Sequence, residues 1–145
     1  MAKSRDAGSP VIQAGAVPYR VLASGGVEVL LITNNSGRWI VPKGGIDAGQ
    51  TAADQAAIEA FEEAGVVEAV IGGEIGFYEY ERGGRLHHVR LFALLVRELA
   101  PDWDESHRRE REWVALEEAI KRVSFDGLRA AMMLVGAAGR KRAAA

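Results

Sequence analysis

Three glutamates, Glu59, Glu62 and Glu63, lie at helical spacing shortly after the glycine pair Gly44 and Gly45. At about 100° per residue, their side chains fall within roughly a third of a helix circumference. The predicted helix that carries them contains no lysine or arginine, so each like-charged pair costs about 0.2–0.5 kcal/mol. A divalent cation would reverse that cost, because Mg²⁺ and Mn²⁺ prefer hard oxygen ligands such as carboxylates.

A metal site of this kind suits phosphoryl chemistry. The cation neutralises phosphate charge and lowers the pKa of a bound water. Gly44 and Gly45 permit close approach to the backbone, so a carbonyl of the turn at 43–49 can add a ligand. A solvated acidic helix face would show the same spacing, and the spacing by itself leaves both interpretations open.

The same stretch resembles the Nudix box, in which glycines, an arginine-glutamate pair and a glutamate pair recur at fixed spacing. The positions that match in register are Gly44, Glu59, Ala60, Glu62, Glu63, Gly65 and Val66. The resemblance implies a Nudix hydrolase with an α/β (α+β) fold, an α/β/α sandwich around a central mixed β-sheet, and Mg²⁺ or Mn²⁺ as cofactor. It also implies that the three glutamates bind metal and act in catalysis, with Glu59 the preferred base. The carbonyl of Gly44 or Gly45 would complete the metal shell.

Two positions of the box depart from the family pattern. Gln50 stands where the first glutamate is expected, and Ile58 stands where the arginine is expected. In the family that arginine generally helps orient the box carboxylates, so an acid and a base are absent together while the three metal-binding glutamates remain. The alternative function is therefore a Nudix-fold nucleotide-binding or regulatory module with weak or no turnover.

The resemblance extends beyond the box, through "RWIVP", "EEAGV" and "DWDESHRREREW", to the diphosphoinositol polyphosphate phosphohydrolase branch. That branch cleaves diphosphoinositol polyphosphates and diadenosine polyphosphates. The predicted activity is thus a metal-dependent pyrophosphohydrolase that cleaves a phosphoanhydride in a dinucleoside polyphosphate or a diphosphoinositol polyphosphate by metal-activated water. Such substrates require a basic pocket. The candidates for it are Arg20, Arg38, Lys43, Arg85, His87, His88 and Arg90.

The elements that position these residues can be predicted from periodicity and turn signals. Strands are expected at 11–21, 27–33, 38–42, 66–81, 86–99 and 112–116, and helices at 51–64, at 117–123 and from 124 onward. Thr51 is the expected N-cap and Gly65 the expected stop of the first helix. Its face toward the sheet is expected to consist of Ala53, Ala57, Ala60, Phe61 and Ala64. The last helix should bury Phe125, Leu128, Met132 and Val135.

Length and charge limit the remaining possibilities. The 145 residues suit one domain, expected at 11–138 between a flexible leader (1–10) and a flexible tail (139–145). The net charge of −2 gives no overall field toward a nucleic acid polymer or a membrane, so a small phosphate-rich molecule is the expected partner. The absence of cysteine excludes disulfides and thiolate metal sites, and it fits the expected cytoplasmic location.

Overall fold

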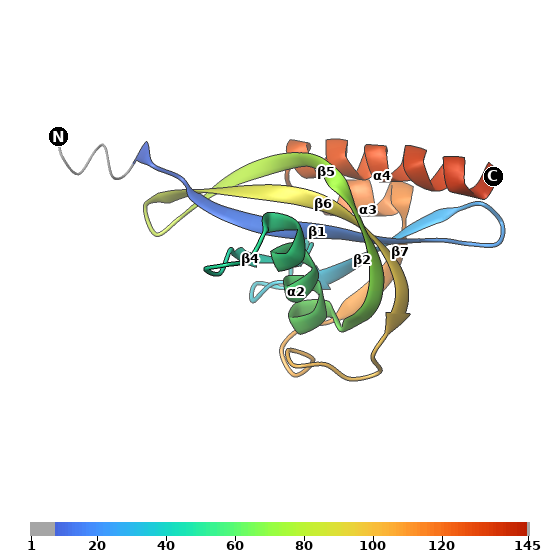
Figure 1. The fold of residues 1–145 in the computed structure, drawn as a ribbon, viewed down its shortest axis with the longest axis horizontal. Helices are drawn as coiled ribbons and strands as arrows, with labels where there is room; N and C mark the ends of the chain where they lie inside the picture. The colour runs from blue at the N-terminus through green and yellow to red at the C-terminus, as the bar shows by residue number, and fades with distance from the viewer. Residues whose placement is uncertain (1–7, 145) are drawn as a thin grey trace.

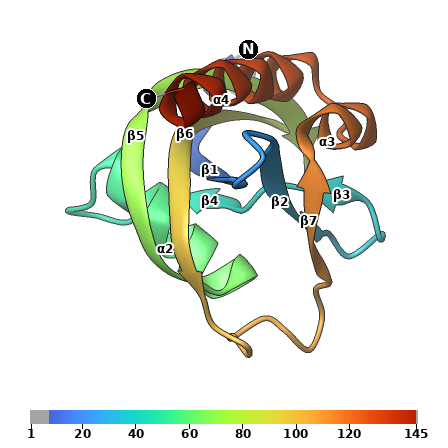
Figure 2. The same ribbon diagram turned by 90° about the vertical axis from the view of Figure 1, so that its right-hand side faces the viewer.

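A sheet of parallel and antiparallel strands forms the centre of the fold, with helices on both sides of it (Figure 1, Figure 2). The computed structural model describes residues 8–144. In chain order its elements are β1 (Val11–Val21), β2 (Val27–Thr33), β3 (Trp39–Ile40), β4 (Lys43–Gly45), α2 (Ala52–Ala64), β5 (Val66–Arg82), β6 (Arg85–Leu99), β7 (Arg111–Ala115), α3 (Leu116–Arg122) and α4 (Asp126–Ala144). This architecture confirms the predicted sandwich with a central mixed sheet.

Strand β1 connects the two halves of the sheet. The strand order is β3-β2-β1-β6-β5, with β4 paired to β1 and β7 paired to β2. The start of β1, residues 13–15, pairs with β4, whereas its end, residues 19–21, pairs with β2. Along the other edge β1 runs parallel to β6. Because β4 takes the position beside β1 that β2 leaves, the glycine-containing segment lies against the sheet and next to α2 (Figure 2).

Apolar side chains pack on both faces of the sheet. In β2, Val29 and Leu31 belong to the core shared with α3 and α4, whereas Leu30 and Ile32 belong to the core shared with α2. Strand alternation therefore supplies both cores from one segment. The α4 residues in the first core are Leu128, Met132 and Val135, with Phe125 packed against it. This confirms the predicted apolar face of the last helix.

Local signals set both ends of α2 as predicted. The Thr51 hydroxyl accepts a hydrogen bond from the Asp54 backbone N–H at 3.1 Å, which satisfies one free donor of the first turn. Gly65 ends the helix in the left-handed region, with φ of +72°, and its N–H bonds back to the Phe61 carbonyl. The helix that carries the carboxylates is thus fixed by its own sequence at both ends.

The buried face of α2 differs from the predicted one. Phe61 is 51% exposed, whereas Glu59 and Glu63 are only 9% and 7% exposed. The residues of α2 in the second core are Ala52, Ala56, Ala60 and Ala64. Positions 59 and 63 are adjacent to these alanines around the helix, so two of the three carboxylates turn inward with them. The expectation that Phe61 packs on the sheet is wrong.

Two segment boundaries also differ from the sequence prediction. The strand expected at 38–42 is limited to β3, and the expected turn at 43–49 begins with β4. Helix α4 continues to Ala144, past the predicted domain end at 138. Its Gly136 and Gly139 lie against Leu116 and Val27, so the absence of side chains lets the helix pack closely there. Residues 1–7 of the predicted leader, and residue 145 of the predicted tail, lie outside the described residues.

Within residues 8–144 no helix has the combination of length and apolar character that crossing a bilayer requires.

Candidate metal and phosphate site

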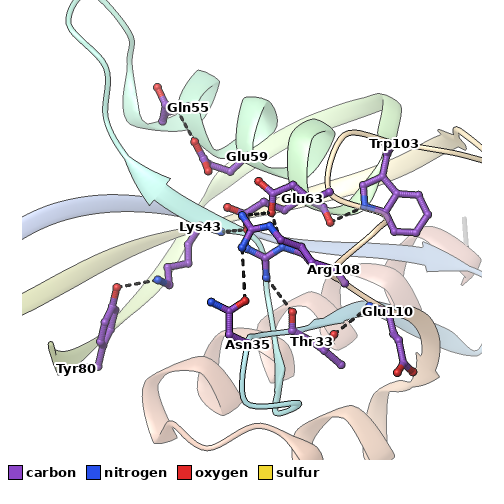
Figure 3. A network of polar contacts seen from close by, with 12 residues as sticks. Thr33, Asn35, Lys43, Gln55, Glu59, Glu63, Tyr80, Trp103, Arg108 and Glu110 are labelled. Carbon is purple, nitrogen blue, oxygen red and sulfur yellow. Dashed lines mark hydrogen bonds and ion pairs between the residues drawn. The ribbon is translucent and has the colours of Figure 1, made fainter.

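Glu59 and Glu63, one helical turn apart on α2, face the backbone of β4 (Figure 3). The Lys43 backbone N–H donates to Glu63 Oε1 at 3.2 Å. A Cβ atom placed on Gly44 would collide with the carboxylate of Glu59. A side chain at position 44 would therefore displace the Glu59 carboxylate, so the glycine lets β4 pack closely against the face of α2 that carries the two glutamates.

Gln55 holds Glu59 from one turn earlier on the same helix. Its Nε2 donates to Glu59 Oε2 at 2.7 Å (Figure 3), and its Oε1 accepts from the Asp47 backbone N–H at 3.0 Å. Gln55 is 1% exposed, so solvent competes little for these two hydrogen bonds. The amide thus joins the turn after β4 to the first carboxylate.

Arg109, in the loop before β7, supplies the cation nearest to Glu63. Its Nη2 lies 3.7 Å from Glu63 Oε1, and its Nε donates to Glu105 Oε1 at 2.6 Å. A further hydrogen bond of 2.8 Å runs from Nη1 to the Thr33 carbonyl. The guanidinium is fixed by three partners and only 11% of its side chain is exposed, so it is oriented before any ligand arrives.

Burial and the neighbouring carboxylate change the protonation of this pair. Burial first, and then hydrogen bonding with Glu59, raise the pKa of Glu63 to about 8, against the lowering effects of Arg109 and of the Lys43 N–H. The pKa of Glu62 is also raised, by burial first and then by the charge of Glu59. The site disfavours the accumulation of negative charge unless a cation joins it.

These residues fit a hard divalent cation. The donors are the carboxylate oxygens of the buried Glu59 and Glu63, and a cation would offset the burial and the carboxylate neighbour that raise the pKa of Glu63. Glu62 is half-buried, and among residues 8–144 no three acidic, histidine or cysteine side chains converge as a ready-made metal cluster. Mg²⁺ is usually held by only one or two carboxylates plus water and substrate phosphates, so a pair of carboxylates suffices.

A cleft of about 610 Å³ opens directly beside Glu63. Its lining combines cations, aromatic rings and amides: Lys43, Arg82, Arg108, Arg109, Tyr78, Tyr80, Phe125, Asn34 and Asn35. Lys43 Nζ donates to the Tyr80 hydroxyl at 2.7 Å (Figure 3), and that hydroxyl donates to Gln13 Oε1 at 2.8 Å. The cleft can therefore receive a ligand with both phosphate groups and a planar ring.

The predicted phosphate-binding residues are divided between this cleft and other surfaces. Lys43 lines the cleft, and His87 stacks on Tyr80 with ring centroids 4.9 Å apart. Arg38 lines an adjoining hollow that shares Asn34 and Phe125 with the cleft.

The remaining four predicted residues have partners outside the cleft. Arg20 pairs with Glu28 at 2.6 Å, His88 with Glu79 at 2.7 Å and Arg90 with Glu74 at 2.7 Å. Arg85 donates to the Ser9 carbonyl at 3.2 Å. His87 and His88 contact different neighbours, Tyr80 and Phe77, as strand alternation predicts.

The two unusual positions of the box lie apart. Gln50 is exposed, and its backbone N–H closes a turn onto the Asp47 carbonyl at 3.0 Å. Ile58 lines an apolar groove of about 300 Å³ together with Phe61 and Val67. The Ile58 side chain thus contributes to an apolar surface rather than to the carboxylate pair.

Several residues of the site were missed by sequence reasoning. Arg108 and Arg109 lie in a run of mixed charge that carries little specificity, and Arg82 is the last residue of β5, in the segment predicted as a hairpin turn. Gln55 carried a usable signal, because it precedes Glu59 by four residues and side chains at that spacing meet on a helix. Trp103, whose Nε1 donates to the Glu63 carbonyl at 2.9 Å, had no signal beyond its loop position.

Comparison with known families identifies the domain. The sequence profile of the NUDIX domain matches residues 14–132 of this chain. That match covers both sides of the sheet and includes α2, β4 and the loop that carries Arg109.

Individual relatives agree with this match. The chain is 36% identical to Nudix hydrolase 21, chloroplastic, of Arabidopsis thaliana, over 81% of this chain and 62% of that protein. It is 40% identical to diphosphoinositol polyphosphate phosphohydrolase 3-alpha of Mus musculus, over 65% of this chain and 58% of that protein. The chain thus spans about three fifths of the length of these curated relatives. A solved structure of a C. elegans Ap4A hydrolase binary complex superposes with a TM-score of 0.71 at 29% identity, covering 89% of this chain and 98% of that one.

Proposed function

The chain belongs to the NUDIX domain family, and from this premise we propose that it is a metal-dependent hydrolase of phosphoanhydride bonds. The observation that carries the proposal is the buried pair Glu59 and Glu63, which lies on the box helix at the margin of a cleft rich in cations. Buried carboxylates that repel each other destabilise a fold, so their presence here is best explained by a ligand that needs them.

In this proposal Glu59 and Glu63 hold Mg²⁺ or Mn²⁺, with Glu62 and a carbonyl of Gly44 or Gly45 as further ligands. When bound, the cation would neutralise phosphate charge and lower the pKa of a coordinated water. Glu59 is the preferred general base. Arg109 and Lys43 contribute charge to bind the phosphates, because both reach the cleft wall beside Glu63.

The proposed substrates are dinucleoside polyphosphates or diphosphoinositol polyphosphates, which the names of the relatives include. The aromatic lining favours the first class, because Tyr80 and Phe125 offer flat surfaces on which a base can stack. An inositol ring has no such flat face. Of the residues predicted to contact phosphate, Lys43 lines the cleft, Arg38 lines the adjoining hollow and His87 stacks on Tyr80, which supports a role for these three. We propose a small phosphate-rich molecule in the cytoplasm as the partner.

The test is a turnover assay with diadenosine tetraphosphate and a diphosphoinositol polyphosphate, each with Mg²⁺, with Mn²⁺ and with EDTA. We expect metal-dependent release of phosphate-containing products, with the dinucleotide cleaved faster. Glu63→Gln should lower the rate by at least about tenfold, because an uncharged amide cannot balance the cation. Arg90→Gln, on a surface away from the cleft, is the matched control and should retain activity.

The second candidate function is a nucleotide-binding or regulatory module, for which the support is Gln50 and Ile58. Binding of the same compounds without turnover, at every metal and pH tried, would replace the hydrolase with this module. Equal turnover in EDTA and in Mg²⁺ would instead contradict the metal dependence.

A further inference from the structure

Gln55 occupies a position that suits the alignment of a metal ligand. Its side chain is 1% exposed and both ends of the amide are bonded, to the Asp47 N–H at 3.0 Å and to Glu59 Oε2 at 2.7 Å. A buried amide with both ends bonded cannot rotate without breaking two hydrogen bonds at once. It therefore fixes one oxygen of Glu59 relative to the turn after β4.

The orientation of the amide follows from its partners. The Asp47 N–H can only donate, so the amide atom that faces it must be the oxygen. The NH₂ group then faces Glu59, where a carboxylate oxygen accepts. The carboxylate also lies directly against Gly44, which limits its movement on the other side.

The composition of α2 explains why a neutral donor is needed. The helix contains no lysine or arginine, and Ile58 is turned to the apolar groove beside Phe61. The nearest fixed cation is Arg109, which forms an ion pair with Glu63. Among the described residues, no ion pair joins Glu59 to a cation. A neutral amide orients a carboxylate without cancelling its charge, so the full negative charge stays available to a divalent cation.

We propose that Gln55 is the positioning residue of Glu59, tying this carboxylate to the turn after β4 in place of the cation that position 58 lacks. The inference rests on the proposed function, in which Glu59 is a metal ligand. It assigns to Gln55 no contact with substrate, because Gln55 is absent from the lining of the cleft.

The experiment uses Gln55→Met, which keeps the length of the side chain and removes both hydrogen bonds. Mn²⁺ alone is titrated into the full chain without substrate, and free Mn²⁺ is followed by electron paramagnetic resonance. We expect the affinity for Mn²⁺ to fall by about tenfold or more. In turnover assays with diadenosine tetraphosphate, the Mn²⁺ concentration for half-maximal rate should rise in parallel, while KM for the dinucleotide at saturating Mn²⁺ stays within about twofold.

Thr51→Ala is the matched control, because it weakens the same helix through its N-cap without touching Glu59. It should lower the melting temperature and leave Mn²⁺ affinity within about twofold. If circular dichroism shows Gln55→Met to be unfolded, Gln55→Asn is used, since a side chain one methylene shorter cannot reach both partners.

Three outcomes decide the inference. Loss of Mn²⁺ affinity in the Gln55 variant but not in Thr51→Ala supports it. The inference is overturned if wild type and the Gln55 variant bind Mn²⁺ equally well, or if the Gln55 variant and Thr51→Ala lose affinity equally. In either case, metal-dependent turnover by the wild-type chain would leave the proposed function intact. A wild-type chain that neither binds Mn²⁺ nor cleaves any diphosphate overturns the proposed function and the inference with it.

Discussion

At the scale of single residues, the site is defined by close contacts between side chains and backbone. Glu59 and Glu63 are held by Gln55, by the Lys43 N–H and by Arg109, so each carboxylate has a partner of its own. The spacing of the carboxylates singled them out in the sequence, and a metal role for them is a prediction from the family resemblance. Of their partners, Gln55 lies four residues before Glu59 on the same helix and could have been predicted. Lys43 and Arg109 come from distant segments that meet the carboxylates only in the folded chain.

The glycine pair of β4 offers a sharp test of this geometry. Gly44→Ala would place a methyl group against the carboxylate of Glu59, so we expect Mn²⁺ affinity and turnover to fall by about tenfold or more. Gly45→Ala is the control, because a Cβ there meets no atom within 4 Å. Metal titration and steady-state kinetics on both variants are the measurements. Equal effects of the two substitutions would contradict the assigned contact.

Glu63 should make the stability of the metal-free protein depend on pH. The folded protein holds a proton on Glu63 up to a pKa of about 8, whereas an unperturbed glutamate loses it near 4.5. Between these values the folded state binds more protons, so the free energy of unfolding should fall as pH rises through this window. Thermal or urea unfolding in EDTA from pH 5 to 9 measures this slope. Glu63→Gln should show a flatter profile, and an unchanged slope would contradict the buried, raised pKa.

At the scale of elements, sequence patterns predicted where strands and helices begin and end better than which side of a helix is buried. β1, β2 and α2 have the predicted limits, because alternation and capping are local signals. The inward face of α2 could not be predicted, since alanines occur around most of the helix and give weak contrast. The rule that apolar side chains face inward then failed at Phe61, which is exposed, and at Glu59, which is buried.

Helix α4 continues past residue 138, where the domain was predicted to end, and the packing of its last turns can be tested. A Cβ added at position 139 would lie 2.5 Å from a methyl carbon of Val27. We therefore expect Gly139→Leu to destabilise the fold by about 1–3 kcal/mol through overpacking. Ala138→Leu, on the exposed side of the helix, is the control and should change stability little. Urea denaturation of both variants is the measurement, and equal stability would show that the last turns of α4 do not pack on β2.

At the scale of the whole molecule, the site joins segments from both halves of the chain. α2 brings the carboxylates, β4 the glycines, the loop before β7 brings Arg109, and β5 brings Tyr80 (Figure 2, Figure 3). Because the unfolded chain cannot hold these groups together, a cation that binds here binds the folded state alone. Metal binding and folding are then thermodynamically linked.

This linkage predicts that Mn²⁺ stabilises the entire fold. At a free Mn²⁺ concentration of 100 times Kd, the free energy of unfolding should rise by about 2.7 kcal/mol. For a chain of this size the melting temperature should then increase by roughly 5–10 °C, and EDTA should reverse the increase. Differential scanning calorimetry across a range of Mn²⁺ concentrations measures both effects at pH 8.5, above the pKa of about 8 of Glu63. Glu63→Gln should lose most of the increase, whereas Arg90→Gln should keep it, because Arg90 pairs with Glu74 on a surface away from the site. A melting temperature that is independent of Mn²⁺ in the wild-type chain would mean that the carboxylates of α2 do not hold a cation in the folded state.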